Sequence, residues 1–254
     1  MRKALSISFI TIKELLHERV FYLIGGFALL AVGVSLLLGD LTYAEQSKIT
    51  LDFLLAGIEL TNLLFSVFMG ITLLHRELNL GWIAMVLSKP VSRTSFLMGK
   101  FLGQAFVQGL VILMMGFLTW GLCSMNQITI VPTSLFQSLL LMFFEGLIMS
   151  SIVYIFAVNL GALLAAASSL VVYALGNFTT GAERTNQALQ QSYVWMALKA
   201  LIPNFRILNM KTLASYGLSI EWNLVGILFL YTLVCCFMYF SAAAVSFSRR
   251  DIFT

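Results

Sequence analysis

Long apolar runs recur along the chain, and only short polar intervals separate them. Each run comes close to or exceeds the roughly 20 mostly apolar residues that a helix needs to cross the hydrocarbon core of a bilayer. Hydrophobic residues make up 60% of the 254 residues and charged residues only 10%, a balance outside that of ordinary globular proteins. The longest polar interval, 179–221, itself contains an apolar stretch at 194–202, which leaves no segment for a soluble domain. The sequence therefore predicts an all-α membrane protein with a single transmembrane domain over residues 1–254.

Six runs fit the length rule and are predicted to be transmembrane helices. They lie at about 20–38, 53–74, 101–123, 135–157, 162–178 and 224–247. The fourth and fifth form one nearly continuous apolar block, about two membrane thicknesses long. We divide this block at Asn159-Leu160-Gly161, because Asn and Gly favour a turn.

Lysine and arginine residues are unevenly distributed between the predicted loops. These cations accumulate in the cytoplasmic flanks of membrane proteins, so the side with more of them is predicted to face the cytoplasm. If both termini are cytoplasmic, ten of the 15 Lys and Arg residues lie inside, namely Arg2, Lys3, Lys13, Arg19, Arg76, Lys89, Arg93, Lys100, Arg249 and Arg250. The other five are Lys48, Arg184, Lys199, Arg206 and Lys211. We attribute the net charge of +4 to this topology and to anionic lipid, and not to nucleic-acid binding.

One cytoplasmic loop, 75–100 (HRELNLGWIAMVLSKPVSRTSFLMGK), combines cations, a proline and an apolar stripe. Apolar residues recur at helical spacing over 78–88, which predicts a short amphipathic helix that Pro90 ends. Arg76 and Arg93 are among the cations that flank the stripe, as suits a helix in the lipid headgroup layer between the second and third spans. On the residues alone, a helix that only anchors at the membrane surface is the simpler interpretation.

Two acidic residues fall inside predicted spans, Glu59 in the second and Glu145 in the fourth. A carboxylate in hydrocarbon is costly and normally faces protein or water. Asn62 and Ser66 follow Glu59 at helical spacing and continue it as one polar stripe. Two interpretations stay open. The four residues line a translocation path, where they contact a cationic or polar part of a substrate or take up protons, or the acids are buried neutral carboxyls hydrogen-bonded to neighbouring helices.

Small residues recur on two of the predicted spans. Gly161 and Ala165 form a small-x-x-x-small pattern in the fifth, and Gly26 and Gly33 share a face of the first. Such faces let helix backbones approach closely where lipid removes the hydrophobic driving force. They predict close packing, either between two copies of the chain or within one subunit.

Residues suited to catalysis or metal binding are scarce. His17 and His75 are the only histidines, and both lie on the predicted cytoplasmic side, so a serine–histidine pair inside the membrane has no base. The 3 cysteines lack metal-ligand spacing, and the 12 methionines are expected to fill gaps in the core and not to bind copper. A phosphate-binding G-x-x-x-x-G-K-[ST] loop is absent as well. The sequence predicts no catalytic site, no metal site and no cofactor bound by this chain.

The loop also carries a spaced motif, which consists of Arg76-Glu77, Gly81, 87–93 (LSKPVSR) and Gly99-Lys100. This motif resembles the loop of type-2 ABC transporter permeases, which reads approximately Glu-Arg-x-x-Gly-Thr, Leu-Ser-x-Pro-x-Ser-Arg and Gly-Lys. The resemblance is to the compact six-span group that includes the permease of nitrous-oxide-reductase maturation and related multidrug and lipid exporters. Trp82 stands where the family usually has threonine.

Three other stretches extend the resemblance over the whole chain. Residues 12–16 (IKELL) resemble the short interfacial elbow helix before the family's first span, and 247–251 (FSRRD) resemble its basic ending. Residues 201–204 (LIPN) resemble its outer loop. The resemblance therefore implies a six-span fold with an N-terminal elbow helix and a cytoplasmic coupling helix between spans two and three.

In that family the coupling helix sits in a cleft on a separate ATP-hydrolysing subunit. The resemblance assigns this role to 75–93, with coupling residues Arg76, Glu77, Gly81, Trp82, Pro90 and Arg93. It implies two copies of an ABC ATPase, which bind ATP and Mg, and a second permease that is identical or a related paralogue. The expected location is a bacterial cytoplasmic membrane.

The function expected from the resemblance is that of a permease that exports an amphiphilic substrate and is not itself an enzyme. Two alternatives stay open. One is a mechanotransmitting or anchoring permease, which acts on an extracytoplasmic machine through an accessory protein. The other is an ATP-independent transporter or channel, which would need broken helices and polar clusters at the membrane midplane.

Overall fold

The computed structural model describes residues 2–17, 20–38, 43–79, 92–126, 128, 130–185 and 202–249. Within these ranges the regular elements are all helical, which confirms the predicted all-α class. The elements are α1 (Arg2–His17), α2 (Val20–Leu38), α3 (Tyr43–Asn79), α5 (Arg93–Met125), α6 (Pro132–Asn159), α7 (Ala162–Thr185), the 3₁₀ turn η1 (Phe205–Ile207), α10 (Lys211–Ser215) and α11 (Trp222–Arg249).

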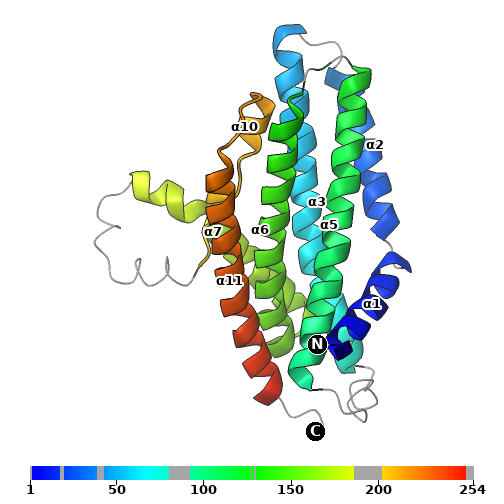
Figure 1. Cartoon of the computed structure of the whole chain (residues 1–254), viewed down its shortest axis with the longest axis vertical. Helices are drawn as coiled ribbons and strands as arrows, with labels where there is room; N and C mark the ends of the chain where they lie inside the picture. The colour runs from blue at the N-terminus through cyan, green and yellow to red at the C-terminus, as the bar shows by residue number, and fades with distance from the viewer. Residues whose placement is uncertain are drawn as a thin grey trace.

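Four helices in the described part of the chain are long and apolar enough to cross a membrane, namely residues Lys48–Arg76 of α3, and α5, α6 and α11. They run alongside one another over the length of the molecule (Figure 1). The predicted span 20–38 coincides with α2, and the predicted span 162–178 is the first part of α7. These helices suggest a membrane protein, and a total of six spans stays a prediction.

Helix ends agree with local sequence signals at several places. α6 ends at Asn159 and α7 begins at Ala162, which confirms the predicted break in the continuous apolar block. α6 begins with Pro132, whose missing N–H costs nothing in a first turn. α5 begins at Arg93, earlier than predicted, because the Ser92 hydroxyl accepts a hydrogen bond from the Ser95 amide (3.3 Å) and caps the helix.

Most of the predicted coupling helix lies outside the described residues. α3 continues to Asn79, so the first two positions of 78–88 belong to the end of that helix. Gly81, Trp82 and Pro90 lie in 80–91, which the structure does not describe, and of Glu77 only the backbone is described. The amphipathic helix itself stays a prediction.

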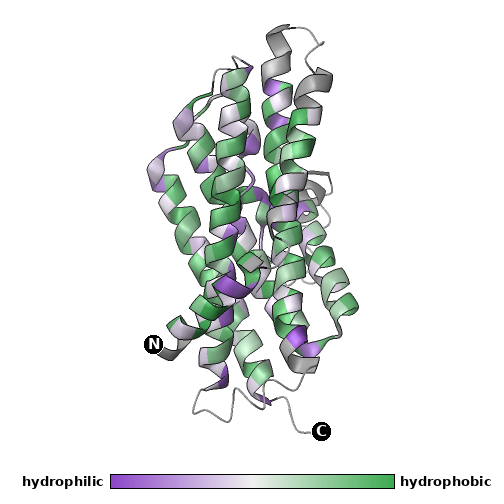
Figure 2. Cartoon of the chain, turned by 90° about the vertical axis from the view of Figure 1, so that its right-hand side faces the viewer, coloured by the Kyte–Doolittle hydropathy of each residue, from purple (hydrophilic) through white to green (hydrophobic). Residues whose placement is uncertain are grey.

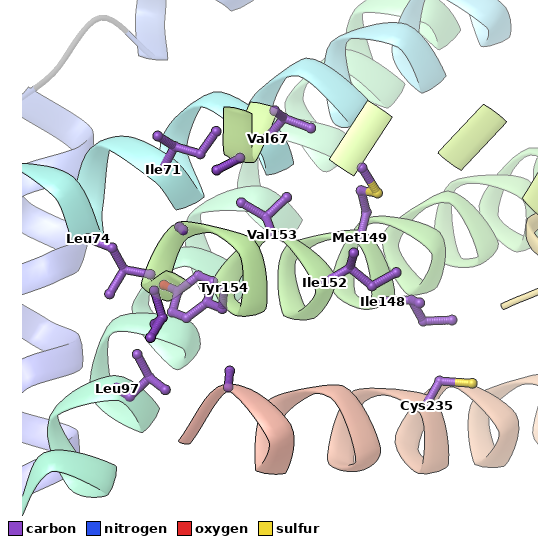
Figure 3. Close-up of a cluster of buried hydrophobic side chains, with 14 of the residues drawn as sticks. Val67, Ile71, Leu74, Leu97, Ile148, Met149, Ile152, Val153, Tyr154 and Cys235 are labelled. Atoms are coloured by element: carbon purple, nitrogen blue, oxygen red, sulfur yellow. The ribbon is translucent and has the colours of Figure 1, made fainter. Parts of the chain in front are cut away.

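The hydrophobic core is centred on α6. Of its apolar stretch 72% is buried, compared with 28% for α11, so α6 is an interior helix and α11 a peripheral one. Figure 3 shows one core cluster, in which Val67 and Ile71 of α3 lie near Val153 of α6, with Cys235 of α11 on another side.

The outer surface of the bundle is also apolar. Hydrophobic residues cover the helices over most of their length, and hydrophilic residues interrupt them at a few levels (Figure 2). Large side chains such as Phe106, Phe117 and Phe237 are more than half exposed. An apolar surface of this extent needs lipid or protein to cover it, as expected for membrane-embedded helices.

The two ends of the bundle differ in what they bring together. α1 lies at the same end as the last turn of α11, and α10 lies at the opposite end (Figure 1). Arg93 at the start of α5 is bonded to the last turn of α11, which places the beginning of α5 at the first of these ends. We call the two ends the terminal end and the α10 end.

Candidate functional site

Asn62 and Ser66 of α3 meet Gln108 of α5 inside the bundle, and each side chain is at most 3% exposed. The Gln108 amide nitrogen donates to Asn62 Oδ1 (2.7 Å) and to Ser66 Oγ (2.8 Å). The Asn62 amide donates in turn to the Met142 carbonyl of α6 (2.8 Å). Two residues of the predicted polar stripe of α3, Asn62 and Ser66, are therefore hydrogen-bonded inside the bundle, in contacts that join three helices.

Gln104 and Ser150 extend these contacts along α5 and α6. Gln104 Nε2 donates to the Ser66 carbonyl and to Ser150 Oγ (both 3.2 Å), and Ser150 Oγ donates to Gln108 Oε1 (3.3 Å). We call Asn62, Ser66, Gln104, Gln108 and Ser150 the polar network. Hydrogen bonds between buried polar side chains hold membrane helices together, because lipid offers them no other partner.

Gly146 of α6 makes room for the polar network. A Cβ atom at this position would lie 1.9 Å from Gln108 Nε2 and 2.7 Å from Asn62 Oδ1. Real Cβ atoms do not approach neighbours so closely, so any larger residue would displace one of these amides. The close approach of α6 to α3 and α5 at this level therefore requires glycine.

Glu59 lies about one turn before Asn62 on α3, towards the α10 end. Its Oε1 accepts hydrogen bonds from Asn209 Nδ2 (2.6 Å) and from the Tyr173 hydroxyl of α7 (3.2 Å), and its Oε2 pairs with the Lys211 ammonium. The Glu59 side chain is 12% exposed and that of Lys211 28%. The carboxylate is thus fully hydrogen-bonded in a largely enclosed place.

Glu145 of α6 approaches Glu59 from the other side. Together with Asn62 and Tyr173 the two acids line one gap, which has no room for a water molecule. Glu145 is 3% exposed, and within the described residues neither of its carboxyl oxygens makes a hydrogen bond. We call Glu59 and Glu145 the acid pair. The structure therefore brings all four predicted path residues into one neighbourhood.

Segment 202–220, which carries Asn209 and Lys211, is docked on the bundle. Phe205 and Leu208 are fully buried, and a Cβ on Gly176 of α7 would lie 2.6 Å from the Phe205 ring. The Gln137 side chain of α6 donates to the Ile220 carbonyl and accepts from its amide, both at 2.9 Å. The backbone that presents Lys211 is therefore fixed on both sides of α10.

A charged cluster at the terminal end joins α1, α3 and α5. Glu14 of α1 accepts a hydrogen bond from Lys100 of α5 (Nζ to Oε2, 2.9 Å) and lies 3.7 Å from Arg76 of α3 (Nη1 to Oε1). The Lys100 side chain is 3% exposed. Next to it, a Cβ on Gly103 would lie 2.7 Å from Thr11 Cβ, so α1 is also pressed against the α5 backbone.

Arg93 contacts the end of α11 within the same chain. Its Nη1 donates to the carbonyls of Phe247 (3.3 Å) and Ser248 (3.2 Å). A cation is favoured at a helix C-terminus, where the last carbonyls lack partners and the helix dipole is negative. Of the six predicted coupling residues, Arg76 and Arg93 are the two whose side chains are described, and both are bonded to other helices of the bundle.

The residues predicted for close packing differ in their surroundings. Ala165 is fully buried within the single chain, so its contacts are inside the subunit. A Cβ on Gly26, Gly33 or Gly161 would meet nothing within 4 Å among the described atoms. Gly26 also lines an apolar groove between α2 and α3 with a volume of about 430 Å³.

Several residues of these clusters were not predicted. Gln104 and Gln108 are two amides one helical turn apart within an apolar span, a signal that could have identified them. Lys211, Asn209 and Tyr173 are more than 100 residues from Glu59 in sequence, and no local pattern marks them as its partners. In the described part of the chain, three or more His, Cys, Asp or Glu side chains are nowhere placed to hold a metal ion.

Neither a scan against protein-family models nor a search of the curated proteins gives a match to this chain. Function is therefore inferred from its residues and their contacts.

Proposed function

We propose that this chain is the membrane-spanning permease subunit of an ATP-driven ABC transporter that exports an amphiphilic substrate. A separate ABC ATPase, in two copies, would bind ATP and Mg and dock on the coupling segment 75–93. The observation that carries the proposal is the set of contacts at both ends of this segment. Where α3 ends and α5 begins, ion pairs and hydrogen bonds link the helices α1, α3, α5 and α11. The side chains involved are Glu14, Arg76, Lys100 and Arg93.

These contacts supply a mechanical route into the membrane. The coupling segment is continuous with α3 and α5, and α5 is tied to α1 by the Lys100–Glu14 ion pair and to α11 by Arg93. A displacement applied where α3 ends and α5 begins would therefore be passed to the helices bonded there. Trp82 is the proposed anchor in the ATPase cleft, because buried aromatic residues dominate many interfaces.

The proposed path for the substrate passes the acid pair and the polar network. Here Glu59, Glu145, Asn62 and Ser66 would face the substrate once the bundle opens. Their hydrogen bonds across α3, α5 and α6, and the lack of room for water beside the acids, are what a closed conformation needs. The open small-residue positions Gly26, Gly33 and Gly161 are available for contact with a second permease.

A mechanotransmitting permease is the second candidate function, and one observation favours it. The polar network closes the space between α3, α5 and α6, and the gap beside the acids has no room for water. A bundle that stays closed in every state could still transmit ATPase motion to an extracytoplasmic partner through segment 202–220. In both functions the chain lies in a bacterial cytoplasmic membrane with both termini inside.

The test is purification of the chain from native membranes in mild detergent, followed by mass spectrometry and an ATPase assay. We expect a stoichiometric ATPase subunit, which Trp82→Ala releases. Trp120→Ala is the matched control, because Trp120 is 52% exposed on α5 and lies outside the coupling segment. Isolation without any ATPase would contradict the proposal, and a co-purified envelope protein would favour mechanotransmission.

A further inference from the structure

Two carboxyl groups and one ammonium group meet at the acid pair. Glu59 accepts hydrogen bonds from Asn209, Tyr173 and Lys211, so both oxygens of its carboxylate have partners. Glu145 faces the same gap, is 3% exposed and has no hydrogen-bond partner among the described residues. Burial of a polar group without a partner is costly, and acids inside membrane helices commonly mark a site of function. The carboxyl oxygens of Glu145 can therefore accept hydrogen bonds that the described contacts do not supply.

Lys211 differs from the acids in how it reaches this gap. The acids project from the long helices α3 and α6, whereas the lysine projects from α10, a helix of 5 residues in segment 202–220. Its side chain is 28% exposed and has a flexible stem, so the ammonium group can swing outwards while the backbone stays docked. Buried contacts of Phe205 and Leu208 keep that backbone in place.

The other walls of the gap suit an organic cation. Tyr173 supplies an aromatic ring, and Leu63 and Met149 supply apolar surface beside the acids. Aromatic faces attract ammonium groups, and apolar side chains can contact the carbon chain attached to one. The ammonium group already present, that of Lys211, shows that the Glu59 carboxylate accepts an alkylammonium cation here.

We propose that the acid pair binds the alkylammonium group of a cationic amphiphile and that Lys211 occupies this site in the conformation described. The ligand's ammonium group would replace that of Lys211 at Glu59 and would also engage Glu145. This inference rests on the proposed function, since it names the substrate class for the same path. In this proposal the Lys211 ammonium group, which is tethered to the chain, competes with the ligand's ammonium group for Glu59.

The experiment uses the full chain in phosphatidylcholine nanodiscs and n-propylammonium, which has the atoms that Lys211→Ala removes from the side chain. If a site is free for only a small fraction of the time, its apparent affinity for a ligand is reduced by that fraction. We expect Lys211→Ala to bind n-propylammonium at least about tenfold more tightly than the unchanged chain does, as measured by ligand-dependent thermal stabilisation. Uncharged n-propanol should show no such difference.

Matched variants separate the site from general effects. Lys211→Arg keeps a tethered cation and should bind the probe as weakly as the unchanged chain. Adding Glu145→Gln to Lys211→Ala should reduce the gain, because the probe then keeps Glu59 but loses the second acid of the gap. If Lys211→Ala does not fold, Lys211→Ser removes the same charge and leaves similar room for the probe.

Equal binding by Lys211→Ala and the unchanged chain would overturn the inference, as would a double variant that keeps the full gain. The assay contains no ATPase, so a negative result would leave the proposed ATPase partnership intact. Conversely, a failure to find an ATPase in native membranes would not alter this binding measurement.

Discussion

The two ends of the bundle each contain a lysine–glutamate pair, but the two pairs differ in how deeply the lysine is buried. At the terminal end, Lys100 lies within the long helix α5, is 3% exposed and bonds Glu14 beside the close contact at Gly103. At the α10 end, Lys211 is 28% exposed, and Glu59 has two further hydrogen-bond donors. The first pair joins α1 to α5 through a buried lysine, and the second joins α3 to α10 through a partly exposed one, while each glutamate has a further partner.

Because the two lysines differ in burial, we expect the pairs to respond unequally to the same substitution. Removing one partner of a buried pair leaves an uncompensated charge, whereas an accessible pair contributes little because water and flexibility compete with it. We therefore expect the terminal end to depend strongly on its lysine and the α10 end to keep its structure when its lysine is replaced.

Of the substitutions that test this difference between the two ends, Lys100→Met should lower the free energy of unfolding most. We expect a loss of about 3 kcal/mol in the free energy of unfolding, the low end for a broken buried pair, since Glu14 is 24% exposed. The measurement is unfolding of the purified chain in mixed micelles by titration with dodecyl sulfate. Adding Glu14→Gln should restore part of the loss, and if it restored none the pair would not be the cause.

Gly103→Ala should have an intermediate effect, because the new methyl group would collide with Thr11 and the Ser8 carbonyl of α1. Overpacking of this kind costs about 1–3 kcal/mol. Limited proteolysis should cut α1 faster in this variant, because α1 no longer packs closely against α5. Gly121→Ala on the same helix meets nothing within 4 Å and serves as the control. Equal proteolysis of the two variants would show that the contact does not hold α1.

Lys211→Met should have the smallest effect on stability, about 1 kcal/mol or less, because the pair is partly exposed and Asn209 and Tyr173 still hold Glu59. Amide hydrogen exchange of residues 205–215 should rise only slightly. Arg206→Met, an exposed cation in the same segment, is the control. A loss as large as that of Lys100→Met would mean that the two ends do not differ in the way described.

The apolar helices could be predicted because their signals are local. Length and hydropathy predicted the long apolar helices, and Asn159 and Gly161 predicted the break between α6 and α7. The true helices are longer at some ends, as α3 begins at Tyr43 and α5 at Arg93. A hydropathy pattern marks only the apolar part of a helix. Helical hydrogen bonding extends beyond it through polar residues to a cap, such as Ser92 at the start of α5.

The candidate site was predictable only on one helix. Glu59, Asn62 and Ser66 share a face of α3, which the 3.6-residue period reveals. Their partners are set by how distant helices pack, and Lys211 lies 152 residues from Glu59. A sequence period cannot report such pairings. Arg93 illustrates the same limit, because its bonds to α11 depend on the arrangement of the whole bundle.

The hydrogen bonds from Arg93 also have a consequence for biosynthesis. They join residues 154 and 155 positions apart, so the carbonyl acceptors at Phe247 and Ser248 leave the ribosome long after the arginine. Helices enter the membrane in order of synthesis, and this joint closes only after α11 has been inserted. An ATPase that requires the finished joint would bind complete subunits and disregard nascent ones. The contact would then act as a checkpoint on assembly.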